Sequence, residues 1–167
     1  MKRIAAFHAI LGAVAVAAAV AAPLPAATPP NFDVITRGPV EFAFEPFPCG
    51  GFRVTGLAVA TGTHVGDGGT FAANECSRPD GAVNHIDGRA TLTTTGGDQI
   101  FIHYYGDAPP FNVITGELAE DIAFSIIGGS GHFADASGDG RLTTEAHFYA
   151  SPIVTARLVG SIEIHSH

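Results

Sequence analysis

Apolar and polar residues alternate along most of this chain, and clusters of Gly, Pro, Asn and Asp interrupt the alternation about every 8 to 14 positions. Alternation with a period of two is typical of strands that bury one face, and no convincing amphipathic helix follows the N-terminal segment. The pattern predicts roughly eight or nine strands. The extended segments are 32–36, 40–44, 52–60, 70–73, 83–95, 99–105, 111–118, 121–127, 141–149 and 153–164.

Turn-forming or polar residues mark the predicted breaks between these strands. Residues 75–81 are predicted to form a loop, and Ala119-Glu120 is predicted to separate two strands. Many short strands with regular turns indicate an all-β fold, either an antiparallel barrel or a sandwich. A barrel is favoured because the last strand, ARLVGSIEI, is apolar enough to need a partner on each side.

Residues 122–144 contain the sharpest predicted corner. The segment begins as a strand, breaks at a glycine cluster around one aromatic residue, and becomes extended again at Arg141. Glycine adopts backbone angles that strain other residues, so these positions are predicted to be structural. The predicted corner residues are Gly128, Gly129, Gly131, Phe133 and Gly138.

The N-terminus has the pattern of a secretory signal peptide. Two basic residues precede an apolar run over 4–20, and small residues follow at 24–28. Prolines end the run early, which disfavours the alternative of a membrane-anchor helix. We therefore predict a signal peptide over 1–27, a single β domain over 28–167, and a secreted or periplasmic location.

The charge composition of the chain argues against some classes of binding partner. The chain has 8 basic and 16 acidic residues, for a formal charge of -8, and loss of Lys2 and Arg3 with the leader would make this -10. Nucleic acids and anionic membranes are bound through clustered Lys and Arg, so neither is an expected partner. Cys49 and Cys76 are predicted to form a disulfide in an oxidising compartment, with a metal pair or a reactive thiol as the alternatives.

Two segments resemble the family of allene oxide cyclase-like and dirigent-like β-barrels, in particular its small exported bacterial members. Residues 128–138, GGSGHFADASG, resemble the GGTGRFAGASG element of that family, and residues 87–107 resemble the strand pair that precedes it. His132 replaces the family's usual Arg or Lys, and Asp135 replaces a Gly. The resemblance implies a calycin-like, eight-stranded antiparallel barrel with an apolar cavity, no cofactor, and in many members a homo-oligomer.

The resemblance suggests that the protein binds a small hydrophobic molecule. One alternative is a cofactor-independent cyclase or isomerase of the allene oxide cyclase or dirigent type, so enzyme activity stays an open question. The other alternative is a structural barrel filled by its own side chains, with no ligand. No catalytic residue of the family is carried over to this chain.

Polar residues that could carry chemistry lie on two of the predicted strands. In the simpler interpretation these stripes face water, whereas in the other they point into a polar pocket mouth, where a His beside a carboxylate could move protons near pH 7. No set of residues has the spacing of a metal motif. The weak catalytic candidates are His103, Tyr105, Glu145, His147 and Tyr149.

Overall fold

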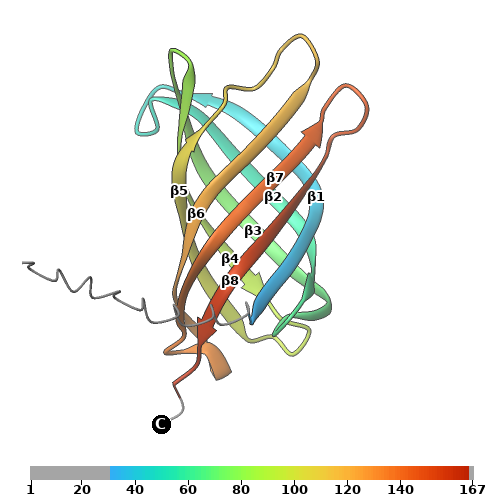
Figure 1. Cartoon of the computed structure of the whole chain (residues 1–167), viewed down its shortest axis with the longest axis vertical. Coiled ribbons are helices and arrows are strands. Elements are labelled where there is room, and N and C mark those ends of the chain that lie inside the picture. Colours follow the sequence, from blue (N-terminus) through green and yellow to red (C-terminus); the bar gives the residue numbers. More distant parts are fainter. Residues whose placement is uncertain (1–30, 166–167) are drawn as a thin grey trace, which may run out of the picture.

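The computed structural model describes residues 31–165, which form a closed barrel of eight antiparallel strands (Figure 1). Each strand pairs with its neighbours in sequence, and β1 also pairs with β8. The predicted all-β, eight-stranded antiparallel barrel is thereby confirmed. The strands are β1 (Phe32–Glu45), β2 (Gly51–Gly62), β3 (Gly66–Asp80), β4 (Val83–Thr93), β5 (Gln99–Ala108), β6 (Glu117–Ser130), β7 (Ser137–His147) and β8 (Ile153–Glu163).

The only helical element in residues 31–165 is the single turn η1 (Gly131–Phe133), between β6 and β7. Within this described range, no helix has the length and apolar character needed to cross a membrane. The predicted signal peptide, residues 1–27, lies outside the described residues.

Polar contacts between β1 and β8 help to close the barrel. The Arg157 guanidinium donates to both carboxylate oxygens of Asp33, at 2.9 Å from Nε and 2.6 Å from one terminal nitrogen. These hydrogen bonds hold the pKa of Asp33 below its usual value, against the opposing effect of desolvation, and the positive charge of Arg157 adds to the lowering. The Asn31 side-chain NH2 donates to the Ile162 carbonyl, and its Oδ1 accepts from the Ile162 backbone N–H. The first and last strands are therefore joined by more than their backbone ladder.

The barrel is filled at one end, which we call the base. Both ends of the described chain and η1 lie there (Figure 1). Phe32 and Phe124 pack with ring centroids 5.8 Å apart, and the ring of Phe133 is buried beside them in the same core. The fully buried large side chains are Phe32, Phe124, Leu92, Ile100, Ile102, Ile122, Leu158, Val34 and Val65.

The corner between β6 and β7 has positive φ at two glycines. Gly128 has φ +121° and Gly131 has φ +59°, and a Cβ on Gly131 would also overlap the Asp98 carboxylate. A break at Gly128 and Gly129 was predicted, but β6 continues to Ser130 through an irregularity in its register with β5. The corner is therefore shorter than predicted.

Other strand boundaries also differ from the prediction. β1 passes through Gly38-Pro39 without interruption, and residues 113–116 form a turn rather than a strand. All of the predicted loop over 75–81 except Gly81 belongs to β3, which ends at Asp80, and the predicted break at 119–120 lies within β6. Strands in this barrel are 10 to 15 residues long, because each must span the whole wall.

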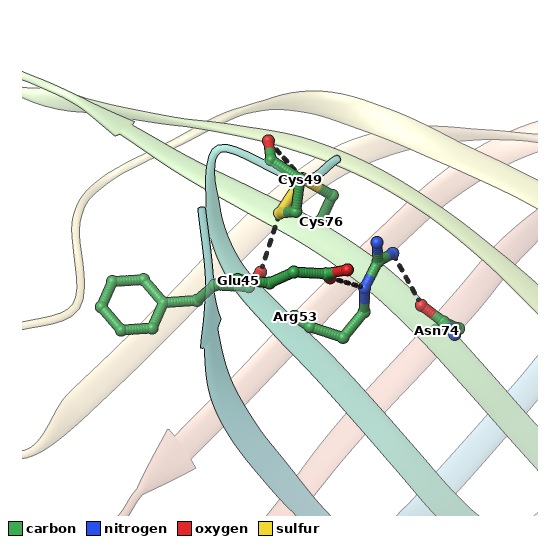
Figure 2. A network of polar contacts seen from close by, with 6 residues as sticks. Glu45, Cys49, Arg53, Asn74 and Cys76 are labelled. Carbon is green, nitrogen blue, oxygen red and sulfur yellow. Dashed lines mark hydrogen bonds and ion pairs between the residues drawn. A yellow bond between two sulfur atoms is a disulfide. The ribbon is translucent and has the colours of Figure 1, made fainter. Parts of the chain in front are cut away.

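The predicted disulfide between Cys49 and Cys76 is confirmed (Figure 2). It ties the loop between β1 and β2 to β3, with the two Cα atoms 5.5 Å apart. Next to it, Arg53 of β2 donates to the Glu45 carboxylate at 2.6 Å and to the Asn74 side chain at 2.9 Å. Dashed lines in Figure 2 join Cys49 Sγ to the Phe52 carbonyl oxygen and Cys76 Sγ to the Cys49 carbonyl oxygen. Disulfide sulfurs have no hydrogen to donate, so these are van der Waals contacts and not hydrogen bonds. The two features hold three strands together at the end of the barrel opposite the base.

Candidate functional site

The barrel interior is hollow in the half opposite the base, which we call the mouth half. A cavity of about 620 Å³ lies there, lined mainly by apolar side chains; all eight strands contribute lining residues, as does the loop between β5 and β6, and the residue from β4 is the polar Asn84. A volume of this size is typical of sites for one small molecule. The alternative of a barrel filled by its own side chains is therefore wrong for this half. The larger apolar lining residues are Val40, Phe42, Phe52, Val54, Phe71, Phe111, Val113, Leu118, Leu142, Phe148 and Val154.

The loops at the mouth carry exposed apolar side chains. In the loop between β5 and β6, Val113 is 69% and Ile114 is 85% exposed, and Phe47 between β1 and β2 is 87% exposed. The Tyr149 hydroxyl donates to the Val113 carbonyl and joins the loop before β8 to the loop before β6. An apolar molecule that approaches the cavity therefore meets an apolar rim first.

A buried carboxyl–phenol pair lies deep in the cavity. Glu75 of β3 and Tyr104 of β5 are both direct partners of Gly88 on β4, which lies between them. Because Gly88 has no side chain, the Tyr104 ring lies over its Cα, and the phenol hydroxyl is hydrogen-bonded to Glu75. Glu75 is only 8% and Tyr104 only 3% exposed. The glycine thus brings together two side chains from strands that are not adjacent.

A second carboxyl lies near this pair. Glu120 is the deepest cavity-lining residue of β6, since the next inward residue, Ile122, belongs to the core. It is paired with Thr144 of β7 in the strand register and hydrogen-bonded to the Thr144 side chain. Part of the Glu120 surface stays open to the cavity, although protein atoms surround the group closely enough to desolvate it.

Burial controls the protonation of these groups. Desolvation, the nearby charge of Glu120 and the opposing hydrogen bond from Tyr104 together raise the pKa of Glu75 to about 8. Desolvation likewise raises the pKa of Glu120, against a hydrogen bond from Thr144, and burial raises the pKa of Tyr104 well above its usual value. The two carboxyls therefore share a site in which ionisation of one opposes ionisation of the other.

Asn84 adds an unsatisfied acceptor on the same wall. Its side-chain NH2 donates to Ser77 Oγ at 2.5 Å, and Ser77 is the next inward residue of β3 after Glu75. Its Oδ1 is buried and has no hydrogen-bond partner among the described residues. Asn84 and Ser77 both line the cavity. A buried acceptor without a donor costs free energy, so this oxygen is suited to a donor supplied by a ligand.

No basic side chain lines the cavity in the described part of the chain. The charged and hydroxyl groups that face it are the carboxyls of Glu75 and Glu120, the phenol of Tyr104, and the hydroxyls of Thr36, Ser77 and Thr144. Within residues 31–165, no group of three or more His, Cys, Asp or Glu side chains could hold a metal ion. Chemically, the site can accept hydrogen bonds, donate or accept a proton near neutral pH, and hold an apolar molecule in place.

The five catalytic candidates from the sequence lie outside this cavity. His103 and Tyr105 point outward from β5, where His103 Nε2 is 2.9 Å from Asp87 Oδ1. Glu145 and His147 are exposed on the outer face of β7, and Tyr149 is 68% exposed in the following loop. The hypothesis that these side chains form a polar pocket mouth is corrected, because the apolar stripe of each strand takes the inner face.

Sequence reasoning missed Glu75 and Glu120, since both fell in predicted breaks. A usable signal was nevertheless present. Counting by two from the apolar stripe Phe71 and Ala73 reaches Glu75, and counting back from Phe124 and Ile122 reaches Glu120. Both glutamates continue the inner face of a strand.

Gly88→Ala is expected to disturb the cavity by displacing the Tyr104 ring that lies over Gly88. A Cβ at this position would overlap Cζ and Cε2 of Tyr104, so the ring must move away from Glu75. We expect the free energy of unfolding to fall by about 1–3 kcal/mol in urea titrations. Gly96→Ala, where a Cβ makes only an ordinary contact, is the control. The cost should shrink when Tyr104→Ala is also present, and an unchanged cost would contradict this packing.

Comparison with known proteins finds no matching family model, no similar curated protein and no similar solved structure.

Proposed function

We propose that this protein is an exported barrel that binds one small hydrophobic molecule in its mouth-half cavity. The observation that carries the proposal is the cavity of about 620 Å³ with mainly apolar walls, beneath a rim of exposed apolar side chains. Eight-stranded barrels of this size can hold one small ligand, and a tight apolar site would shield that ligand from water. Export is supported by the pattern of residues 1–27 and by the disulfide.

The family resemblance points in the same direction. The glycine-rich segment 128–138 comprises the end of β6, η1 and the start of β7 in an eight-stranded barrel, the architecture that the resemblance to allene oxide cyclase-like and dirigent-like barrels implies. Membership of that family is part of the proposal, as is a homo-oligomeric state. Native mass spectrometry of protein purified from culture supernatant tests the homo-oligomeric state and the presence of a ligand, since it reports the mass of the assembly and of any bound molecule that denaturation releases.

Val54→Trp is expected to weaken the binding of a neutral apolar probe. Val54 lines the cavity from β2, and an indole there would occupy part of its volume. N-phenyl-1-naphthylamine fluoresces in apolar surroundings, so a titration gives its affinity directly. We expect at least a tenfold loss of affinity relative to the native chain, because the displaced volume can no longer bury the probe.

Val59→Trp is the matched control. Val59 lies on the same strand, is 58% exposed and points outward. The native chain has no tryptophan, so each variant carries a single indole whose emission reports its surroundings. Val54→Trp should emit at shorter wavelength than Val59→Trp. Equal probe affinity in the two variants, with both folded, would contradict a ligand site in this cavity.

A cofactor-independent isomerase or cyclase is the second candidate. The observation that favours it is the Glu75–Tyr104 pair, because a buried carboxyl with a pKa near neutrality can exchange protons with a bound molecule. No histidine lines the cavity in the described residues. If the bound molecule is converted to an isomer of equal mass, Glu75→Gln should stop conversion while retaining binding. Conversion at the native rate in that variant would exclude this mechanism.

A further inference from the structure

We propose that the cavity selects an apolar molecule that carries a protonated amine, with the ammonium group held between Glu75 and Glu120. This inference rests on the proposed function, since it names the chemical class of ligand for the same cavity. It follows from the set of polar groups on the wall, which match an ammonium and leave other head groups unpaired.

Acceptors outnumber donors among the polar groups on the cavity wall. Glu75 and Glu120 supply four carboxylate oxygens when ionised, and Asn84 supplies an Oδ1 that has no partner among the described residues. The protein donors close to them are the hydroxyls of Tyr104 and Thr144, which bond to one carboxyl each. An ammonium group has three donors and no acceptor, so it complements this surplus.

Charge points to the same class of ligand. The cavity has two carboxyls and no basic side chain among its described lining residues, so a ligand carboxylate would meet only like charge and no cationic partner. A neutral alcohol would satisfy an acceptor but would not offset the burial of two acids. An ammonium ion allows at least one of them to ionise without leaving a buried charge unpaired.

The shape of the site separates head from tail. Glu120 and Tyr104 are the lining residues of β6 and β5 nearest the base, and on β3 only Phe71 and Ala73 line the cavity on the base side of Glu75. Phe52, Phe111 and Phe148 line the half nearer the mouth. A ligand would therefore place its amine toward the base and its apolar part under the rim. Asn84 lies higher on the wall, beside Ser77, where it could accept from a donor further along the ligand.

Binding has a proton balance that can be measured. In the free protein near pH 7, Glu75 holds a proton because of burial and the neighbouring Glu120, and Tyr104 beside it is neutral. Asp87, on the outer face of β4, is the other charge that acts on Tyr104. When an ammonium ion binds, the Glu75 carboxyl gives up its proton to solvent and becomes the carboxylate partner. Up to one proton is released per ligand, and a neutral alcohol releases none.

The test compares three probes of equal chain length, namely decylamine, decanol and decanoate. Each displaces N-phenyl-1-naphthylamine from the purified protein at pH 7, which gives its affinity. Decylamine should bind about tenfold or more tightly than decanol, because hydrogen bonds to a charged group are stronger than those between neutral groups, and decanoate should bind weakest. Calorimetry in two buffers with different ionisation enthalpies should show proton release for decylamine alone.

Glu75→Gln/Glu120→Gln removes both ionisable carboxyls and keeps the shape of the site. The ratio of decylamine to decanol affinity should fall to near one in this variant, and proton release should disappear. Glu145→Gln on the outer face of β7 removes a carboxylate without touching the cavity, so its ratio should match the native value. If the double variant fails to fold, Glu75→Gln alone should still lower the ratio and abolish proton release.

The outcomes distinguish this inference from the proposed function. If the fluorescent probe and decanol bind but decylamine gains nothing, the amine selectivity is wrong and the apolar cavity remains a ligand site. If none of the probes binds to the folded native protein, the proposed function is wrong. An amine preference that survives in the double variant would place the cation elsewhere and overturn the assignment to Glu75 and Glu120.

Discussion

Glu75→Gln is expected to stabilise the ligand-free protein at pH 8 by on the order of 4 kcal/mol and to change its stability little near pH 4.5. The pKa of Glu75 is raised from 4.5 to about 8, chiefly by burial and then by the charge of Glu120. Glutamine is close in shape to the protonated carboxyl. At every pH it therefore supplies the neutral form, which the folded barrel prefers below about pH 8.

The direction in which the free energy of unfolding changes with pH follows from proton linkage. Between pH 4.5 and 8 the unfolded chain has lost the Glu75 proton while the folded barrel keeps it, so the folded state binds more protons. The free energy of unfolding of the native chain therefore falls as the pH rises through this window and levels off above it. Glu120, whose pKa is also raised, contributes in the same direction.

Urea titrations of the refolded, ligand-free protein at pH 5, 6, 7 and 8 would measure this effect. The native chain should lose stability across the series, and Glu75→Gln should show a much flatter profile. Glu145→Gln, on the outer face of β7, is the matched control and should keep the native slope. A native profile that is flat or rises between pH 5 and 8 would mean that Glu75 is ionised in the folded barrel.

Cys49→Ser/Cys76→Ser is expected to lower the free energy of unfolding by roughly 3 kcal/mol. The bond joins residues separated by 27 positions, and its loss lets that loop of the unfolded chain sample many more conformations. The double variant leaves no unpaired thiol. Urea titrations of the oxidised native chain and the variant give the difference, and dithiothreitol should lower the stability of the native chain only.

Arg53→Gln serves as the control at the same end of the barrel. It removes the contacts of Arg53 with Glu45 and Asn74 next to the disulfide but leaves the covalent bond in place (Figure 2). Because this ion pair is partly exposed, its loss should cost less than about 1 kcal/mol. Equal losses in the two variants would show that the polar contacts, not the disulfide, hold this end together.

The outer position of His103 and His147 shows that the alternation of apolar and polar residues predicts which face of a strand is buried. Both β5 and β7 have one apolar and one polar stripe, and the simpler interpretation of the sequence was that the polar stripe faces the solvent. β5 agrees with this interpretation, with Ile100, Ile102 and Tyr104 on the inner face and His103 on the outer face. The acid–His hypothesis required the opposite parity, in which the isoleucines would lose their burial in the core.

The two buried glutamates show where local pattern failed. Residues 75–81 are polar and contain Gly and Pro, which usually indicates a loop, but β3 continues there because it forms backbone ladders with β2 and β4. The Glu75 side chain then faces a cavity that contains Tyr104, where a hydrogen bond compensates part of its burial. Neither the ladder partners nor the cavity can be read from the segment itself.

The sequence by itself determined the all-β class, because period-two alternation and turn residues are local signals, and it predicted the disulfide because the chain has only two cysteines. It favoured a closed antiparallel barrel over a sandwich, and pairing of β1 with β8 in the tertiary structure decided between them. Only the tertiary structure decided which face of each strand is inside and how far each strand runs. It also decided that half of the barrel is hollow. Gly88 brings Glu75 and Tyr104 together only after β3, β4 and β5 are paired in register, so the site is a property of the closed sheet.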